Sequence, residues 1–409
     1  MLPRIKPFKA FHYNPQLIKD FSSVVCPPYD VIDEKEEINF KKRSPYNFCN
    51  ILLANREKDY KCLAKKFNDW ITKGILVQDD QEYFYLYEQT FFYEGREIRR
   101  VGMLSLLRLE RGGVIFPLEG TLKESKEDRF CILKEIEANL EPIFVLSSQR
   151  INTLGEIYEA YVKRKPFISF KDFTGVKVRL WKVGEVFWQK KLCEEIVDRE
   201  FIIADGHHRF EVACSYYQKY KDKFKDLNYI LAYFSDPTQG IVILPTHRII
   251  KVRIGWEEAR QRLEKYFCME PIEEAHLKDR FSQAKRLCFG IYREGKFYYL
   301  ELKKEFILDK IVKEKESKIY RDVDIYFLHN FVFKLSEAET VKYIHTMGEV
   351  KRLTQEGEVC FLVKPIALNT IFRIAKKGYR LPQKSTYFYP KLLNGLVIRK
   401  FAPRREFNS

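Results

Sequence analysis

The sequence of 409 residues has no apolar run approaching the roughly eighteen residues of a membrane-spanning helix. Its first seven residues, Met1 to Pro7, lack the apolar core of a signal peptide. We therefore expect a cytoplasmic protein that has no membrane partner.

Motifs that mark common metal and nucleotide sites are also missing. The chain has no H-E-x-x-H motif and no paired C-x-x-C motif, which disfavours a zinc site. It also has no Walker loop, the common nucleotide-binding motif. Its nine cysteines are scattered singly, mostly within apolar patterns where a thiol behaves as a small core side chain. No disulfide framework is implied, and internal repeats are absent.

Charge is plentiful but not clustered. The net charge is +16, from 73 basic and 57 acidic residues. A concentrated basic patch would favour nucleic acid, but here Lys and Arg alternate with Glu and Asp, which is typical of solvated helix faces. A helix-turn-helix pattern is missing as well. Nucleic acid is therefore not expected as a partner.

Length and composition predict a folded protein with more than one core. Apolar residues make up 45% of the chain and aromatic residues 15%. Strand and helix patterns interchange along the chain, so we expect a mixed α/β (α+β) fold. Four segments are predicted: 1–150, 151–254, 255–335 as a supporting or homodimer-forming lobe, and 336–409.

Local patterns make further predictions. The apolar run Cys49–Leu53 is expected to be a buried strand, and the β-rich runs between Tyr83 and Leu109 are expected to form a hairpin around Tyr93–Arg96. Ser125–Asp128 has the form of a capping box that opens a helix. Lys126 and Arg129 lie on the first turn of that helix, where a solvated turn is favoured over a nearby anion.

The most informative stretch runs from Phe201 to Ala213. Four apolar residues lead into Asp205-Gly206, and apolar residues then recur at helical spacing, which predicts a strand, a tight turn and a helix. A turn that opens a helix offers unpaired N–H groups to an anion. His207, His208 and Arg209 follow at once, so a phosphate loop is predicted. The alternative is that Asp205 caps the helix and the next three residues are solvated.

Three further loops carry candidate side chains. Glu119 lies in an apolar setting that would raise its pKa toward that of a general base, although a plain surface role is the alternative. Lys384 lies beside two hydroxyl groups in a Pro-bounded loop suited to phosphate oxygens. The other candidates are Ser385 and Thr386 in this loop, Tyr29 and Asp30 after a Pro pair, and His247 and Arg248 at the predicted end of the strand 241–248.

In order along the chain, these motifs resemble the bacterial family called domain of unknown function 1015. The matching blocks span nearly the whole sequence: Pro27–Val31, Pro45–Phe48, Glu119–Arg129, Asn139–Phe144, Ala204–Phe210, Thr246–Arg248 and Pro382–Lys391. One position departs from the family pattern, because Leu118 stands where the family usually has His before Glu119.

That family is in turn similar to the ParB/sulfiredoxin superfamily, within which free-serine kinases most resemble the Asp205–Arg209 motif. The resemblance implies that Glu119 is the base, and that Asp205, His207 and His208 face the phosphoryl group or a metal. It also implies that Arg209 and Lys384 clamp the charge. ATP or ADP with Mg²⁺ at Asp205, and a small hydroxyl metabolite such as serine, would be the ligands.

Three functions remain open at this stage: a small-molecule phosphotransferase, a nucleotide-binding ParB-like regulator, and a non-catalytic phosphate-binding protein. Fold alone does not decide among them. A phosphate site needs donors that converge. We therefore expect Glu119, the Asp205–Arg209 turn and the Lys384–Thr386 loop to gather at one cleft.

Overall fold

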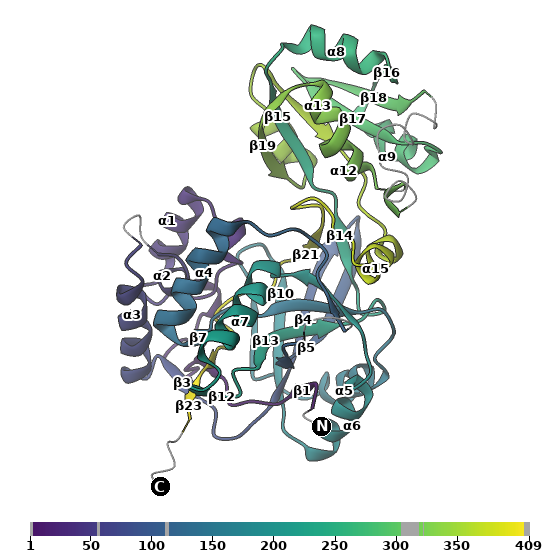
Figure 1. Ribbon diagram of the computed structural model, residues 1–409. Coiled ribbons are helices and arrows are strands. Elements are labelled where there is room, and N and C mark those ends of the chain that lie inside the picture. The colour runs from purple at the N-terminus through teal and green to yellow at the C-terminus, as the bar shows by residue number, and fades with distance from the viewer. Residues whose placement is uncertain (1–2, 55–57, 111–113, 304–318, 322, 405–409) are drawn as a thin grey trace. The chain divides into compact units, whose positions relative to one another are not determined.

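A computed structural model describes residues 3–54, 58–110, 114–303, 319–321 and 323–404. The chain divides into two compact units (Figure 1). Unit 1 consists of Met1–Pro117, Thr121–Val242 and Pro390–Ser409, and unit 2 consists of Leu118–Gly120 and Ile243–Tyr389. These boundaries differ from the four segments expected, because short pieces of the chain cross from one unit to the other.

Unit 1 is built on a nine-stranded mixed sheet. Along the sheet the strands are β6 (Ile115–Phe116), β11 (Phe201–Asp205), β8 (Ile143–Ser147), β13 (Tyr229–Ser235), β5 (Arg96–Arg108), β4 (Phe84–Tyr93), β10 (Lys177–Val183) and β9 (Ile168–Lys171), and β1 (Ile5–Lys6) also pairs with β5. The β11–β6 and β13–β8 pairs are parallel. The mixed α/β class is confirmed.

Strands β4 and β5 form the predicted hairpin. Glu94 and Gly95 at its tip have φ values of 49° and 74°, the left-handed pair that a two-residue hairpin turn requires. Leu86 and Met103 on these strands face the main core of unit 1. The helices α5 (Asn152–Tyr161), α6 (Val186–Ile196) and α7 (His207–Tyr220) contribute to the same core.

Further helices and short strands complete unit 1. They are α1 (Glu34–Arg43), α2 (Cys49–Leu52), α3 (Tyr60–Thr72), α4 (Lys123–Ile136), the 3₁₀ turns Phe21–Ser23 and Tyr29–Val31, and the strand pairs β7 (Ala138–Asn139) with β22 (Arg399–Lys400) and β12 (Phe224–Lys225) with β23 (Ala402–Pro403). Helices α4 and α7 lie side by side (Figure 1) and share an apolar cluster that includes Leu133 and Val212.

Two local predictions in unit 1 were wrong. The run Cys49–Leu53 was expected to be a buried strand but forms helix α2, because the Asn47 side chain accepts the Cys49 N–H at 3.0 Å and starts a helical turn. Helix α4 does not start from a capping box at Ser125. Leu122 is its N-cap, without a side-chain cap of its own.

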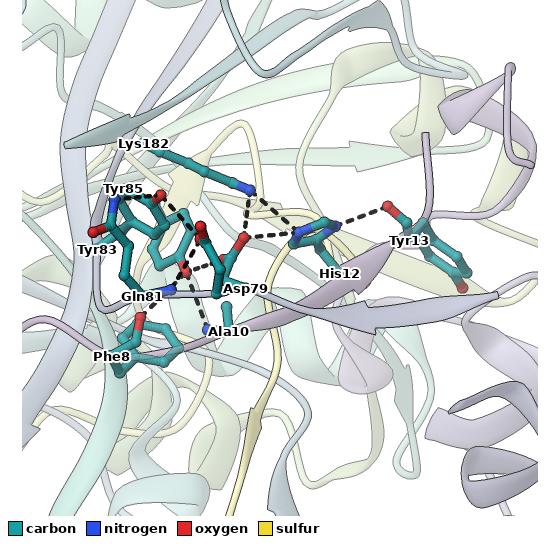
Figure 2. A network of polar contacts seen from close by, with 10 residues as sticks. Phe8, Ala10, His12, Tyr13, Asp79, Gln81, Tyr83, Tyr85 and Lys182 are labelled. Atoms are coloured by element: carbon teal, nitrogen blue, oxygen red, sulfur yellow. Dashed lines mark hydrogen bonds and ion pairs between the residues drawn. The ribbon is translucent and has the colours of Figure 1, made fainter. Parts of the chain in front are cut away.

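A buried polar network ties the segment around His12 to the rest of unit 1 (Figure 2). His12, in β2 (Phe11–Tyr13), lies 3.0 Å from a carboxylate oxygen of Asp79, which follows β3 (Leu76–Gln78). Lys182 and the Tyr85 hydroxyl donate to the same carboxylate. The buried charge of Asp79 is therefore compensated by three donors.

Unit 2 has a six-stranded antiparallel sheet. Its order is β16 (Phe267–Ile272), β18 (Lys296–Leu302), β17 (Cys288–Arg293), β20 (Glu358–Leu362), β15 (His247–Val252) and β19 (Ala338–Ile344). Its helices include α8 (Trp256–Glu264), α9 (Glu274–Gln283), α12 (Asp324–Phe327), α13 (Phe333–Leu335), α14 (Met347–Leu353) and α15 (Leu368–Lys376), and β21 (Tyr387–Tyr389) follows.

One predicted strand is split. The run 241–248 was expected to end in His247-Arg248, but Pro245-Thr246 separates β14 (Val242–Leu244) from β15, and His247 opens the second strand. Pro lacks the N–H that a continuous ladder needs. No helix in the described part of the chain is long and apolar enough to cross a membrane.

Candidate functional site

The Asp205 turn, which we define as Asp205–Arg209, has the predicted strand-turn-helix form. Strand β11 ends at Asp205, and α7 begins at His207. Gly206 between them has a φ of 90°. A Cβ atom there would lie only 3.0 Å from both Arg209 Nε and a methyl group of Ile143. The turn therefore needs glycine for its backbone conformation and for the close approach of Arg209.

The carboxylate of Asp205 is held by two cations. Lys391 Nζ donates to Oδ1 at 2.5 Å, and Arg209 donates to Oδ2. The exposed fraction of each of these three side chains is at most 16%. Arg209 also donates to the carbonyl oxygen of Pro142. Lys391 was not predicted as a site residue. Its position at the end of the Pro382–Lys391 motif block could have pointed to it.

A second acidic group keeps Arg209 charged. Burial lowers the pKa of Arg209, but Glu141 and Asp205 outweigh this effect, so the net shift is upward. Glu141 is buried and accepts the backbone N–H of Tyr29 at 3.3 Å. Its other oxygen lies 3.7 Å from Arg129. Arg209 is thus embedded in a set of compensated charges.

Arg129 is a correction to the sequence prediction. A solvated first turn was favoured, yet Arg129 is buried and its guanidinium lies 4.0 Å from the centre of the Tyr29 ring. Arg129, Glu141 and Arg209 line a cavity of about 50 Å³. Asp30, the other predicted substrate residue, is exposed and acts on Arg209 through its charge.

The two histidines of the turn differ. His207 is buried at the start of α7. His208 Nε2 accepts the backbone N–H of Leu122 at 2.9 Å, so this ring serves as the cap at the start of α4. Close by, Glu211 accepts from Thr121 at 2.7 Å and from Lys126 at 3.1 Å. His208 therefore couples the Asp205 turn to helix α4.

Glu119 lies in unit 2 and is fixed by a nearby loop. One of its oxygens accepts the N–H and the hydroxyl of Thr386, both at 2.9 Å, and the other accepts the Lys384 N–H at 3.0 Å. Burial raises the pKa of Glu119, although Thr386 and Lys384 oppose the shift. Lys384 has a φ of 53°, a strained conformation for a residue other than glycine.

Arg248 contacts this loop, whereas its neighbour His247 contacts another segment. Arg248 is fully buried and donates to the carbonyl oxygen of Lys384 at 2.8 Å and to His329 at 3.2 Å. His247 Nδ1 accepts the Val363 N–H at 3.2 Å, and burial lowers the pKa of His247 to about 3. Ser385 donates to the carbonyl oxygen of Pro382 at 2.6 Å. The Arg248 and Ser385 contacts hold the loop in its conformation.

The predicted residues therefore form two groups. Unit 1 holds Tyr29, Asp30 and the Asp205 turn, and unit 2 holds Glu119, Lys384–Thr386, His247 and Arg248. Their convergence at one cleft stays a prediction.

A resident Mg²⁺ ion does not fit the side chains of the Asp205 turn. Both oxygens of Asp205 already pair with cations. Within the described ranges, no three His, Cys, Asp or Glu side chains form a group that could hold a metal. A divalent ion would have to arrive with a phosphate ligand, which commonly supplies part of the coordination of Mg²⁺.

The family comparison decides the classification. The family described as "Protein of unknown function (DUF1015)" matches residues 5–326. The chain belongs to the DUF1015 family. No curated protein matches this DUF1015 chain.

Solved structures resemble the DUF1015 chain only distantly. SbnI with a C-terminal truncation from Staphylococcus aureus is 11% identical, with a TM-score of 0.40 over 72% of this chain and 86% of that one. A conserved hypothetical protein from Pyrococcus furiosus is 13% identical, with a TM-score of 0.36 over 74% and 94%. A free serine kinase in complex with AMP is also 13% identical, with a TM-score of 0.36 over 70% and 86%.

Proposed function

We propose that this DUF1015 protein transfers a phosphoryl group between a nucleoside phosphate and a small hydroxyl compound, with free serine and phosphoserine as the first pair to test. The observation that carries the proposal is the group of buried cations around the Asp205 turn. Lys391, Arg209 and Arg100 all act on the single carboxylate of Asp205. Glu141, the other buried carboxylate that acts on Arg209, is shared with Arg129. Several cations that share few carboxylates attract an anionic ligand.

The turn also suits a phosphate group in its geometry. The first N–H groups of α7 have no acceptor earlier in their own helix, and the helix dipole favours negative charge at this end. Gly206 lets the backbone take a φ of 90° and brings the Arg209 guanidinium close to the turn. We assign phosphate binding to the backbone from Gly206 to Arg209. Lys391 and Arg209 offset the negative charge of the phosphate.

In the forward direction, a hydroxyl oxygen of the acceptor forms a bond to the terminal phosphorus of the nucleotide. The bond from that phosphorus to the bridging oxygen breaks, and the shortened nucleotide leaves with the bonding electrons. The hydroxyl proton passes to a base. We assign this role to Glu119, because its carboxylate is held in a fixed orientation and burial raises its pKa.

Mg²⁺ enters the proposal only as the companion of the nucleotide phosphates, whose charge it would partly neutralise. The roles of Lys384 as a clamp and of Tyr29 and Asp30 as substrate contacts rest on the motif resemblance. The similarity of this protein to the ParB/sulfiredoxin superfamily also stays a prediction.

A non-catalytic phosphate-binding protein is the second candidate. Both carboxylates that would take part in catalysis already have partners, which favours this candidate. Asp205 pairs with two cations, and Glu119 accepts three hydrogen bonds. A protein of this kind would bind nucleotide without turnover.

One experiment separates the two. Purified protein is mixed with Mg²⁺, serine, and ATP or ADP, phosphoserine is followed by mass spectrometry, and thermal stabilisation by each nucleotide is measured in parallel. Phosphoserine formation together with stabilisation supports the transferase. Stabilisation without product from any nucleotide supports the binding protein. If no nucleotide gives either product or stabilisation, both assignments are overturned.

A further inference from the structure

The backbone that carries Lys391 is held by two buried polar side chains. Gln89 on β4 and Arg100 on β5 are direct cross-strand neighbours, so their side chains lie on the same face of the sheet. Each side chain is only 1% exposed. Burying a guanidinium and an amide in a sheet is costly unless their polar groups are bonded. The contacts of this pair therefore indicate what it does.

Both side chains reach the C-terminal segment. Gln89 Nε2 donates to the carbonyl oxygen of Lys391 at 3.0 Å. One terminal nitrogen of Arg100 donates both to Gln89 Oε1 and to the carbonyl oxygen of Pro390. The two ends of the Gln89 amide are thus used in one defined orientation. Two consecutive carbonyl groups, immediately before and at Lys391, are fixed to the sheet.

Aromatic rings pack against the buried guanidinium of Arg100. Its guanidinium lies 5.3 Å from the centre of the Phe144 ring and 5.9 Å from that of Tyr233. Gly102, two residues along the strand, makes room for this packing, since a Cβ there would lie 2.2 Å from the Tyr233 ring. The negative charge of Asp205 also acts on Arg100. Arg100 is therefore closely packed, and its charge is coupled to that of Asp205.

We infer that Gln89 and Arg100 are positioning residues, which fix the Pro390–Lys391 backbone so that Lys391 Nζ stays on Asp205. Neither side chain is assigned a contact with the reacting atoms. The effect of this pair on ligand binding rests on the proposed function, whereas its effect on the location of Lys391 does not.

The location of Lys391 can be measured without a substrate. Acetylation by an amine-reactive ester requires an accessible amine, and Lys391 is 11% exposed and paired. The full-length protein is labelled briefly, and the rate at Lys391 is compared by mass spectrometry with the rate at Lys190, which is 77% exposed. The same rates are then measured in variants that have lost one of the two holding contacts.

Two variants disturb the contacts in different ways. Arg100→Met removes the bonds to Pro390 and Gln89 but keeps an apolar side chain of similar length. Gln89→Glu keeps an acceptor for Arg100 but places a carboxylate oxygen against the Lys391 carbonyl group. Arg99→Met is the matched control, because Arg99 lies on the same strand and is exposed. Thermal unfolding verifies that each variant is folded.

We expect the Lys391 rate to rise roughly tenfold in both variants, which corresponds to about 1.4 kcal/mol for the loss of one hydrogen bond that holds the backbone. The control should leave it unchanged. If Arg100→Met does not fold, Gln89→Glu and Gln89→Leu decide the question. An unchanged Lys391 rate in the folded variants would overturn the inference.

Nucleotide affinity provides the second measurement. If Lys391 becomes reactive and ATP binds more weakly, both the positioning role and the proposed function are supported. If Lys391 becomes reactive while ATP binding is unchanged or absent in all proteins, the positioning role stands and the proposed function fails.

Discussion

The backbone N–H and the side-chain hydroxyl of Thr386 both donate to the same oxygen of Glu119, each at 2.9 Å. Lys384 N–H donates to the other oxygen at 3.0 Å. Glu119 therefore has a structural role in unit 2 whether or not it is also the base. A test of catalysis has to separate the two roles.

Replacing Glu119 by Gln provides that separation when stability and turnover are measured together. A Gln amide has one acceptor oxygen for three donors, so at least one N–H loses its partner, at a cost of about 1–3 kcal/mol in unfolding free energy. Loss of a general base should also lower turnover roughly 100- to 10,000-fold, with nucleotide affinity almost unchanged.

Thr386→Val is the control for Glu119. It removes only the hydroxyl donor and should cost about 0.5–1.5 kcal/mol in unfolding free energy, because the backbone N–H still donates. Its turnover should stay within roughly tenfold of the natural protein. If Glu119→Gln reduces stability but leaves turnover like that of Thr386→Val, Glu119 is not the base.

Gly206→Ala should destabilise unit 1 and perturb the Asp205 turn. The φ of 90° is unfavourable for alanine, and the added Cβ would crowd Arg209 Nε at 3.0 Å. We expect a loss of about 1–3 kcal/mol, measured by urea unfolding. Gly155→Ala in helix α5 meets nothing within 4 Å and should instead stabilise by up to about 1 kcal/mol. Equal effects of both substitutions would contradict the role of Gly206.

Local patterns predicted the Asp205 turn well, because a strand, a Gly break and a helix follow one another within a few residues. The Cys49–Leu53 run misled, since a short apolar stretch does not distinguish a strand from a buried turn of helix. Lys391 could not be paired with Asp205 from sequence, because 186 residues separate them. The burial of Arg129 likewise depends on Tyr29 and Glu141, which only the tertiary structure brings to it.

The network around Asp79 should make unit 1 sensitive to acid. Burial raises the pKa of Asp79, but hydrogen bonds from His12, Lys182 and Tyr85 outweigh it, and the net shift is downward. A carboxyl with a lowered folded-state pKa contributes stability above its unfolded pKa of about 3.9. This contribution is lost as the pH falls through the folded-state value.

Asp79→Asn should therefore cost about 3 kcal/mol at neutral pH, because it leaves the half-buried Lys182 ammonium without its carboxylate partner. The difference from the natural protein should shrink as the pH falls below about 4. Thermal unfolding across pH 2 to 8 measures both effects, and Asp80→Asn at the exposed neighbouring position is the control. A difference that does not depend on pH would contradict the assigned role of the Asp79 charge.

Lys391→Met tests whether the buried cation at the Asp205 turn serves a ligand or only Asp205. A phosphate that bonds to the Lys391 ammonium gains a charge-assisted hydrogen bond worth about 1.5–3 kcal/mol. Losing it should weaken ATP or ADP binding roughly 10- to 100-fold by calorimetry. Lys400→Met, in the same C-terminal segment but outside the turn, should leave the affinity unchanged. If Lys391→Met lowers the melting temperature while the nucleotide affinity stays constant, Lys391 is only a counter-ion of Asp205, and phosphate binding must be assigned to other donors.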